Sequence, residues 1–231
     1  MALEARPHID RHYEEELREL RHLILTMGGF VEKQIADAMQ TLVHRDAEAA
    51  RTVIERDKTV NRMDVEIDDF ALRLLALHQP AARDLRLITT ALKITTDLER
   101  AGDMAENICE RAIELAAEPQ LKPLIDLPRM AGFAQTMLRE SLDAFVREDV
   151  DLALKVCHDD DQVDELTSQL FRELISFMVE DPRTISRALR LILVAKYLER
   201  LGDHATNIAE MVIFMVKGKS IRHMDRPPAS L

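Results

Sequence analysis

Two short segments of this chain each place two carboxylates one helical turn apart. Residues 98–108 read LERAGDMAENI and residues 198–208 read LERLGDHATNI, so eight of eleven positions are identical at an offset of 100 residues. Helical periodicity alone asks only for apolar residues at matching phases, whereas here Glu, Arg, Gly, Asp and Asn all recur in place. The chain is therefore internally duplicated, and each copy presents a Glu and an Asp on one helical face. These residues are Glu99, Asp103, Glu199 and Asp203.

A further set of oxygen-bearing side chains precedes each motif at helical spacing. The residues are Asp57, Asn61 and Asp64 before the first motif, and Asp160 and Asp164 before the second. On an isolated helix such like-charged neighbours cost only a few tenths of a kcal/mol, and an acidic helical face is usually just solvated. One stripe alone would therefore indicate little. Two stripes that face each other, and that occur twice, favour a binding site.

The positions of the prolines predict that the stripes do face each other. Asn61 lies 19 residues before Pro80, and Glu99 lies 19 residues after it. A short turn at Pro80 makes the two helices antiparallel, so residues equally far from the turn lie level. The second half repeats this alignment around Pro182 to within one residue. We therefore expect one cluster of facing oxygen atoms in each half.

Oxygen atoms that converge in this way predict a bound cation. Carboxylates from neighbouring helices repel one another unless a cation or a proton lies among them. The set contains no Cys and no paired His, so a hard divalent or iron-type ion held by oxygen, such as Mg, Mn or Fe, fits better than zinc or copper. Thr167 stands where Asp64 stands in the first half, which predicts a weaker second site.

Apolar periodicity predicts six long helices and an all-α fold. Apolar residues recur at steps of three and four over residues 13–42, 60–78, 82–117, 127–147, 150–179 and 183–217. The proline-rich segment PQLKPLIDLP at 119–128 is the one boundary that the composition indicates. We expect two tandem three-helix bundles at residues 8–118 and 124–217, followed by a loose tail at 218–231. Gly28 and Gly29 predict a bend or a close helix contact in the first helix.

Composition excludes several classes of protein. The 231 residues include 31 Lys and Arg against 42 Asp and Glu, a formal net charge of −11, which repels nucleic acids and anionic lipid surfaces. No apolar run is long enough to span a bilayer, and the first residues lack the apolar stretch of a signal peptide. We expect a cytoplasmic protein that neither binds nucleic acid nor inserts into a membrane. Leftover apolar helix faces favour a homodimer.

The duplicated pattern resembles the PhoU family. The matching elements are LERAGD at 98–103 and LERLGD at 198–203, each followed by Asn-Ile, and the resemblance extends over residues 10–217. It implies a non-enzymatic regulator of phosphate uptake and phosphate-starvation signalling that binds the ATPase of a phosphate importer and a sensor histidine kinase. It also implies metal ions at Glu99, Asp103, Glu199 and Asp203, with Asp57, Asn61, Asp160 and Asp164 as the facing positions.

Two other functions remain open from the residues alone. A metal-dependent carboxylate-bundle enzyme could activate water, but no nucleophile or general base stands out, and the Glu-x-x-His element of di-iron bundles occurs only at Glu19–His22. A metal-free helical interaction module would use the acidic faces to recognise basic partner surfaces. His204 lies beside the second motif but has Met104 as its counterpart, so we expect a supporting or surface role for it.

Overall fold

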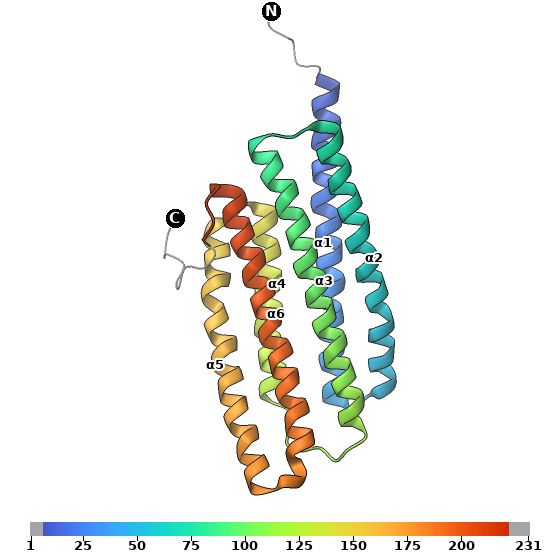
Figure 1. Cartoon of the computed structure of the whole chain (residues 1–231), viewed down its shortest axis with the longest axis vertical. Coiled ribbons are helices and arrows are strands. Elements are labelled where there is room, and N and C mark those ends of the chain that lie inside the picture. The colour runs from blue at the N-terminus through green and yellow to red at the C-terminus, as the bar shows by residue number, and fades with distance from the viewer. Residues whose placement is uncertain (1–6, 222–231) are drawn as a thin grey trace, which may run out of the picture.

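The chain is helical throughout the part that the structure describes. A computed structural model describes residues 7–221, with side chains from residue 11 onward, and Figure 1 shows long helices lying side by side. No strand occurs between residues 7 and 221, which confirms the predicted all-α class. The elements are α1 (Pro7–His44), α2 (Ala47–His78), α3 (Ala82–Ala116), α4 (Asp126–Arg147), α5 (Val150–Glu180), a 3-10 turn η1 (Pro182–Thr184) and α6 (Ile185–Lys217).

Local signals define the helix ends in both halves. The carboxylate of Asp46 accepts a hydrogen bond from the Ala49 N–H at 2.9 Å, and that of Asp149 accepts one from the Leu152 N–H at 3.0 Å. These are N-caps of α2 and α5, and each satisfies a donor that the first helical turn would leave unpaired. The helix α2 ends at His78, directly before the predicted Gln79-Pro80 break. The duplication therefore extends to the caps.

The two halves lie against each other along their first and third helices. The helices α1, α2 and α3 pack together, as do α4, α5 and α6, and the two groups meet where α3 packs on α6 and α1 packs on α4. The helices α2 and α5 lie on opposite outer sides of the molecule (Figure 1). The groove between α2 and α3 and the groove between α5 and α6 are therefore the places where the duplicated motifs can meet the preceding acidic stripes.

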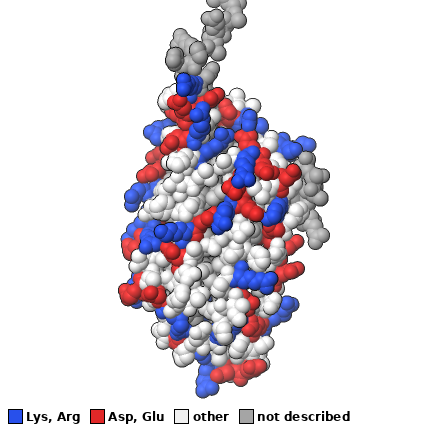
Figure 2. All heavy atoms as spheres, turned by 180° about the vertical axis from the view of Figure 1, so that it is seen from behind, with Lys and Arg blue, Asp and Glu red and all other residues white. Residues whose placement is uncertain are grey.

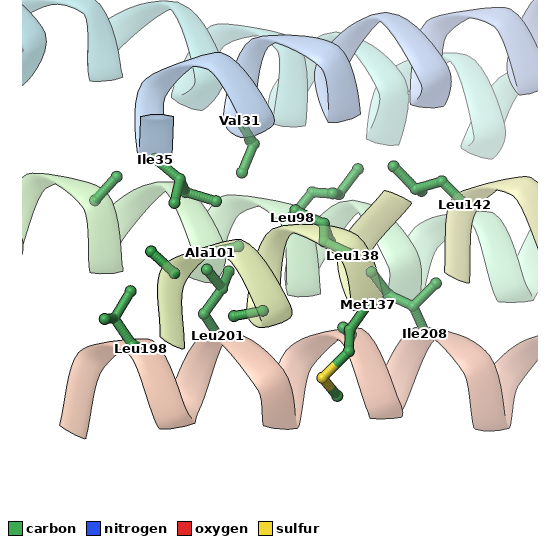
Figure 3. Close-up of a cluster of buried hydrophobic side chains, with 14 of the residues drawn as sticks. Val31, Ile35, Leu98, Ala101, Met137, Leu138, Leu142, Leu198, Leu201 and Ile208 are labelled. Atoms are coloured by element: carbon green, nitrogen blue, oxygen red, sulfur yellow. The ribbon is translucent and has the colours of Figure 1, made fainter. Parts of the chain in front are cut away.

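One hydrophobic core crosses the boundary between the halves. Buried side chains from both halves form a single cluster. Figure 3 shows side chains of α1, α3, α4 and α6 pointing toward one another at its centre. The labelled residues are Val31, Ile35, Leu98, Ala101, Met137, Leu138, Leu142, Leu198, Leu201 and Ile208. Burial of apolar surface contributes about 25 cal/mol per Å², so this shared core joins the two bundles energetically.

The predicted close contact at Gly28 is present. The helix α1 runs without a break past Gly28, and a Cβ atom at this position would overlap Leu142 of α4. Around Gly29 there is open space, because nothing lies within 4 Å of the place a Cβ atom would take. The first glycine therefore allows α1 and α4 to approach across the two halves.

The connection between the halves is irregular and is tied down by charged side chains. Lys122, in the proline-rich segment, forms ion pairs with Asp126 at 3.3 Å and with Glu173 of α5. At the other end of the second bundle, Ile221 packs into the core with 2% of its surface exposed. The first residues of the predicted loose tail are therefore anchored, and residues 222–231 lie outside the described residues.

Charges of both signs are mixed on the surface. Figure 2 shows blue and red side chains interleaved with uncharged surface over one face, with no large area of one sign. Between residues 7 and 221, no helix combines the length with the apolar character that crossing a membrane requires.

Candidate metal centre

Three carboxylates meet in the groove between α2 and α3. Asp57 of α2 and Asp103 and Glu106 of α3 each offer an oxygen atom, and these atoms all lie within 4.8 Å of one another. Asp57 is buried, whereas Asp103 and Glu106 are half-buried. The structure thus brings together one residue from each predicted stripe and adds Glu106, which was not among the predicted ligands.

Asp57 is held in place by amide groups and by a close helix approach. The Gln34 Nε2 of α1 donates to Asp57 Oδ1 at 3.0 Å, and the Asn61 Nδ2 donates to Asp57 Oδ2 at 2.8 Å. A Cβ atom on Gly102 would lie only 3.1 Å from Asp57 Oδ1. Glycine is a poor helix former, and here it gives the carboxylate room against the backbone of α3. Asn61 therefore acts as a hydrogen-bond donor to the site.

The carboxylates of the first site disfavour one another's charged forms. Burial, followed by the charge of Asp103, raises the pKa of Glu99, while the guanidinium of Arg100 opposes this. Burial and Asp57 raise the pKa of both Asp103 and Glu106. Arg100 is the one nearby cation on α3, with its nitrogen atoms 3.4 Å from Glu99 Oε2 and 3.4 Å from Asp103 Oδ2. This single arginine leaves an excess of negative charge.

Asp64 lies further along the same groove. It is half-buried, and burial followed by the neighbouring Asp68 raises its pKa, with Arg100 acting in the opposite direction. It contributes to the negative potential at Glu99 but does not belong to the group of three that meets around Asp57. The predicted ligand set is therefore divided into a compact centre and a more open extension.

The groove between α5 and α6 repeats the arrangement with differences. Burial, followed by the charges of Asp203, Asp164 and Glu199 among others, raises the pKa of Asp160 to about 7. A Cβ atom on Gly202 would lie 2.9 Å from Asp160 Oδ1, so this glycine repeats the role of Gly102. The predicted residues of the second half therefore surround Asp160 closely enough to repel its charge.

The second site is more open than the first. Asp164 and Asp203 are exposed, and Lys196 forms an ion pair with Glu199. Among the described residues, the second half has no group of three Asp, Glu, His or Cys side chains as compact as the one around Asp57. Thr206 stands where Glu106 stands in the first half. Whether the second site holds an ion stays a prediction.

A polar contact joins α3 and α6 across the boundary between the halves. The His204 Nδ1 of α6 lies 2.9 Å from Asp97 Oδ1 of α3, and the Asn207 Nδ2 donates to the same oxygen at 3.2 Å. Burial, followed by a neighbouring carboxylate, raises the pKa of Asp103 and that of Asp203, and a protonated His204 opposes both shifts. His204 therefore lies within electrostatic reach of both acidic sites.

Two residues of the first site, Glu106 and Gln34, were not among the predicted site residues. The sequence contains a signal for Glu106 but none for Gln34. Glu106 follows Asp103 by three residues and thus continues the same helical face. Gln34 belongs to α1, 23 residues before Asp57 and on neither stripe, and only the packing of α1 on α2 and α3 brings it to Asp57. Its other amide atom, Oε1, is buried without a hydrogen-bond partner within the described residues.

The geometry of the first site suits a hard cation. Its ligand atoms are oxygens, its carboxylates are buried at Asp57 and half-buried at Asp103 and Glu106, and the unpartnered oxygen of Gln34 lies beside them. A cation among these groups would stabilise their charged forms, because an opposite charge within a few ångströms lowers a carboxyl pKa. The residues that would hold the ion are Asp57, Asp103 and Glu106.

Comparison with known proteins supports a single family. A family model described as the PhoU domain matches residues 24–112 and, a second time, residues 127–212. The phosphate-specific transport system accessory protein PhoU homolog of Pseudomonas aeruginosa is 44% identical over 218 residues, which cover 94% of this chain and 90% of that protein. The PhoU protein of Escherichia coli is 38% identical over 223 residues, covering 96% and 92%.

Solved structures give the same result. The crystal structure of PhoU from Pseudomonas aeruginosa superposes with a TM-score of 0.86 at 45% identity, covering 90% of this chain and 100% of that one. The phosphate transport system regulatory protein PhoU from Streptococcus pneumoniae superposes with a TM-score of 0.85 at 27% identity, covering 90% and 99%. The resemblance that the duplicated motifs predict is confirmed.

Proposed function

The chain belongs to the PhoU family, and from this membership we propose that it regulates a phosphate importer and the response to phosphate starvation. The observation that carries the proposal is the match of PhoU domains to both halves, together with relatives that are named as accessory proteins of the phosphate-specific transport system. Those names describe accessory proteins rather than enzymes.

The proposed partners are the importer's ATPase and a sensor histidine kinase, with the chain acting in the cytoplasm. Phosphate itself is a poor ligand for the acidic grooves, because anion would meet anion at Glu99 and Asp103. Phosphate would therefore reach this protein as a signal through a partner. A bound cation would adjust the charge of the groove surface that such a partner meets.

Binding assays with the two partners test the regulatory role. We expect the purified chain to bind the importer ATPase and the kinase of its own organism, and to show no binding to an ATPase from an unrelated importer. Deleting the gene should uncouple a phosphate-starvation reporter from external phosphate. A reporter that still follows phosphate after deletion, together with an absence of binding, would contradict the proposal.

We further propose that the first site binds a divalent or iron-type cation through Asp57, Asp103 and Glu106. Three observations support this proposal. The three carboxylates converge, the pKa values of Asp103 and Glu106 are raised, and the Gln34 Oε1 beside them has no hydrogen-bond partner among the described residues. The ion would supply charge neutralisation, which the single Arg100 does not complete. The second site would hold its ion more weakly, since Thr206 replaces Glu106.

Elemental analysis and melting curves test the metal proposal. Protein prepared without chelator should contain Mg, Mn or Fe, and EDTA should lower its melting temperature. An ion at about 100 times its Kd adds about 2.7 kcal/mol to the free energy of unfolding. The Asp57→Asn/Asp103→Asn variant should lose most of this stabilisation, while Glu110→Ala, one turn further along α3, should keep it.

The same measurements distinguish the metal-free alternative. Protein that contains no stoichiometric metal and whose melting temperature does not respond to EDTA or added ions would favour a helical interaction module with solvated acidic faces. Partner binding that persists in EDTA would then assign the recognition to the helix surfaces themselves.

A further inference from the structure

The outer face of α2 exposes apolar side chains over about three helical turns. Val65, Leu72 and Leu77 are 58%, 56% and 72% exposed, although each is large and apolar. Val65 and Leu72 are seven residues apart, as are Phe70 and Leu77, so the two pairs form adjacent rows on one side of the helix. A single exposed leucine is ordinary, but a contiguous apolar patch indicates a partner.

A groove runs along this face where α2 meets α1. This α1–α2 groove has a volume of about 610 Å³, and Leu23 of α1 lines it together with Phe70 and Leu72 of α2. Leu23 and Phe70 are half-buried and pack against the hydrophobic core, so the base of the groove is apolar. The helix α2 lies on the outer side of the molecule (Figure 1), which leaves the groove accessible. From Val65 to Leu77 the face extends about 18 Å, the length of a helix of about 12 residues.

Unpaired carboxylates border the apolar base. Glu66 and Asp69 line the groove, and within residues 11–221 neither forms an ion pair. The charge of Asp69 adds to burial in raising the pKa of the neighbouring Asp68. Among the described residues that line the groove, the cation is Arg73, whose Cζ lies over the Phe70 ring at 5.5 Å from its centroid. The lining therefore has more negative than positive charge.

The second half differs at the corresponding positions and satisfies its carboxylates within the chain. An offset of 103 residues relates the N-caps of α2 and α5, and at this offset Asp126 replaces Leu23. Glu173 replaces Phe70, and Lys122 of the connecting segment forms ion pairs with both carboxylates. The side chain of Lys122 is only 8% exposed. A basic side chain thus pairs with carboxylates in the second half, whereas the first half presents an apolar base and carboxylates without a partner.

We infer that the α1–α2 groove binds a basic amphipathic helix of another protein. Apolar side chains of such a helix, spaced by three, four and seven residues, would lie on Leu23, Phe70 and Leu72. Its lysines or arginines would lie beside Glu66 and Asp69. Charge complementarity disfavours nucleic acid, an anionic lipid surface and a second copy of this chain, whose own net charge is −11. The inference does not depend on the proposed regulatory function.

Binding of a synthetic peptide to the full chain tests the chemistry of the occupant. The probe is a peptide of about 14 residues with leucine and lysine at amphipathic helical spacing and one tryptophan in its apolar stripe. Because the chain contains no Trp, the fluorescence of this residue reports binding without background. We expect the lysine peptide to bind at physiological ionic strength. A peptide with glutamate in place of each lysine should bind roughly 10-fold more weakly or worse.

Paired variants test whether the peptide lies in the α1–α2 groove. Leu72→Ser/Leu77→Ser removes exposed apolar surface and should weaken the lysine peptide by roughly 10-fold or more. Glu66→Lys/Asp69→Lys should weaken the lysine peptide and strengthen the glutamate peptide. The control Glu165→Lys/Glu180→Lys makes the same change of net charge at exposed positions of α5 and should leave both affinities as in the wild type. Circular dichroism should show equal helix content in all four proteins.

Three results would overturn the inference. The first is a lack of lysine-peptide binding to the wild type, or equal affinity for the two peptides. The second is lysine-peptide binding that Leu72→Ser/Leu77→Ser leaves intact, which would place the peptide elsewhere on the chain. The third is a wild-type chain that, without peptide, sediments as a larger species than Leu72→Ser/Leu77→Ser, which would assign this face to a contact between copies.

Discussion

At the scale of single residues, Asp160 lies in an environment that disfavours its charged form. Burial and the surrounding carboxylates raise its pKa from 3.8 to about 7. In the unfolded chain the same group loses its proton near pH 3.8. The metal-free folded state therefore binds more protons than the unfolded state between these two values, and the contribution of Asp160 to stability falls as pH rises through that window.

Replacing Asp160 by Asn should remove this pH dependence, since an amide has no charge to lose. In chelator-containing buffer, Asp160→Asn should gain stability relative to the wild type on going from pH 5 to pH 8, as measured by urea unfolding. Glu180→Gln, an exposed change far from the site, should follow the wild type at both pH values. Parallel stability profiles for Asp160→Asn and the wild type would show that the carboxylate is not strained in the fold.

At the scale of elements, adjacent glycines in α1 serve different purposes. Gly29→Ala should stabilise the protein by up to about 1 kcal/mol, because alanine is the better helix former and the site is open. Gly28→Ala should be less stable than Gly29→Ala, because its Cβ atom overlaps Leu142 of α4 and overpacking costs about 1–3 kcal/mol. Urea midpoints compare the two variants, and equal midpoints would argue against a tight α1–α4 contact.

At the scale of the whole molecule, the shared core predicts that the two bundles unfold together. Leu201 of α6 is fully buried where helices of both halves meet (Figure 3). Leu201→Ala should cost about 2–5 kcal/mol, as large-to-small core changes do. Hydrogen exchange should then accelerate in both α2 and α5, whereas the exposed change Leu72→Ala should leave both protected. Loss of protection in α5 alone would indicate that the bundles are independent.

The sequence predicted the helices and the duplication well because their causes are local. Apolar spacing and the breaks at Pro80 and Pro182 act within a few residues, and the structure has a helix in each of the six expected ranges, with α2 beginning at Ala47 rather than at 60. Equal spacing around Pro80 also predicts that Asp57 lies level with Asp103, and the structure places these two residues together.

What the sequence by itself determined is therefore the family, the all-α class and the residues that face each other across a short turn. Only the tertiary structure decided which atoms gather at the site and how the halves join. Gln34 reaches Asp57 from the preceding helix, and His204 reaches Asp97 from the other half of the chain. Such contacts depend on how helices pack around a common core, and helical periodicity determines which face of each helix is buried but not which neighbour that face meets.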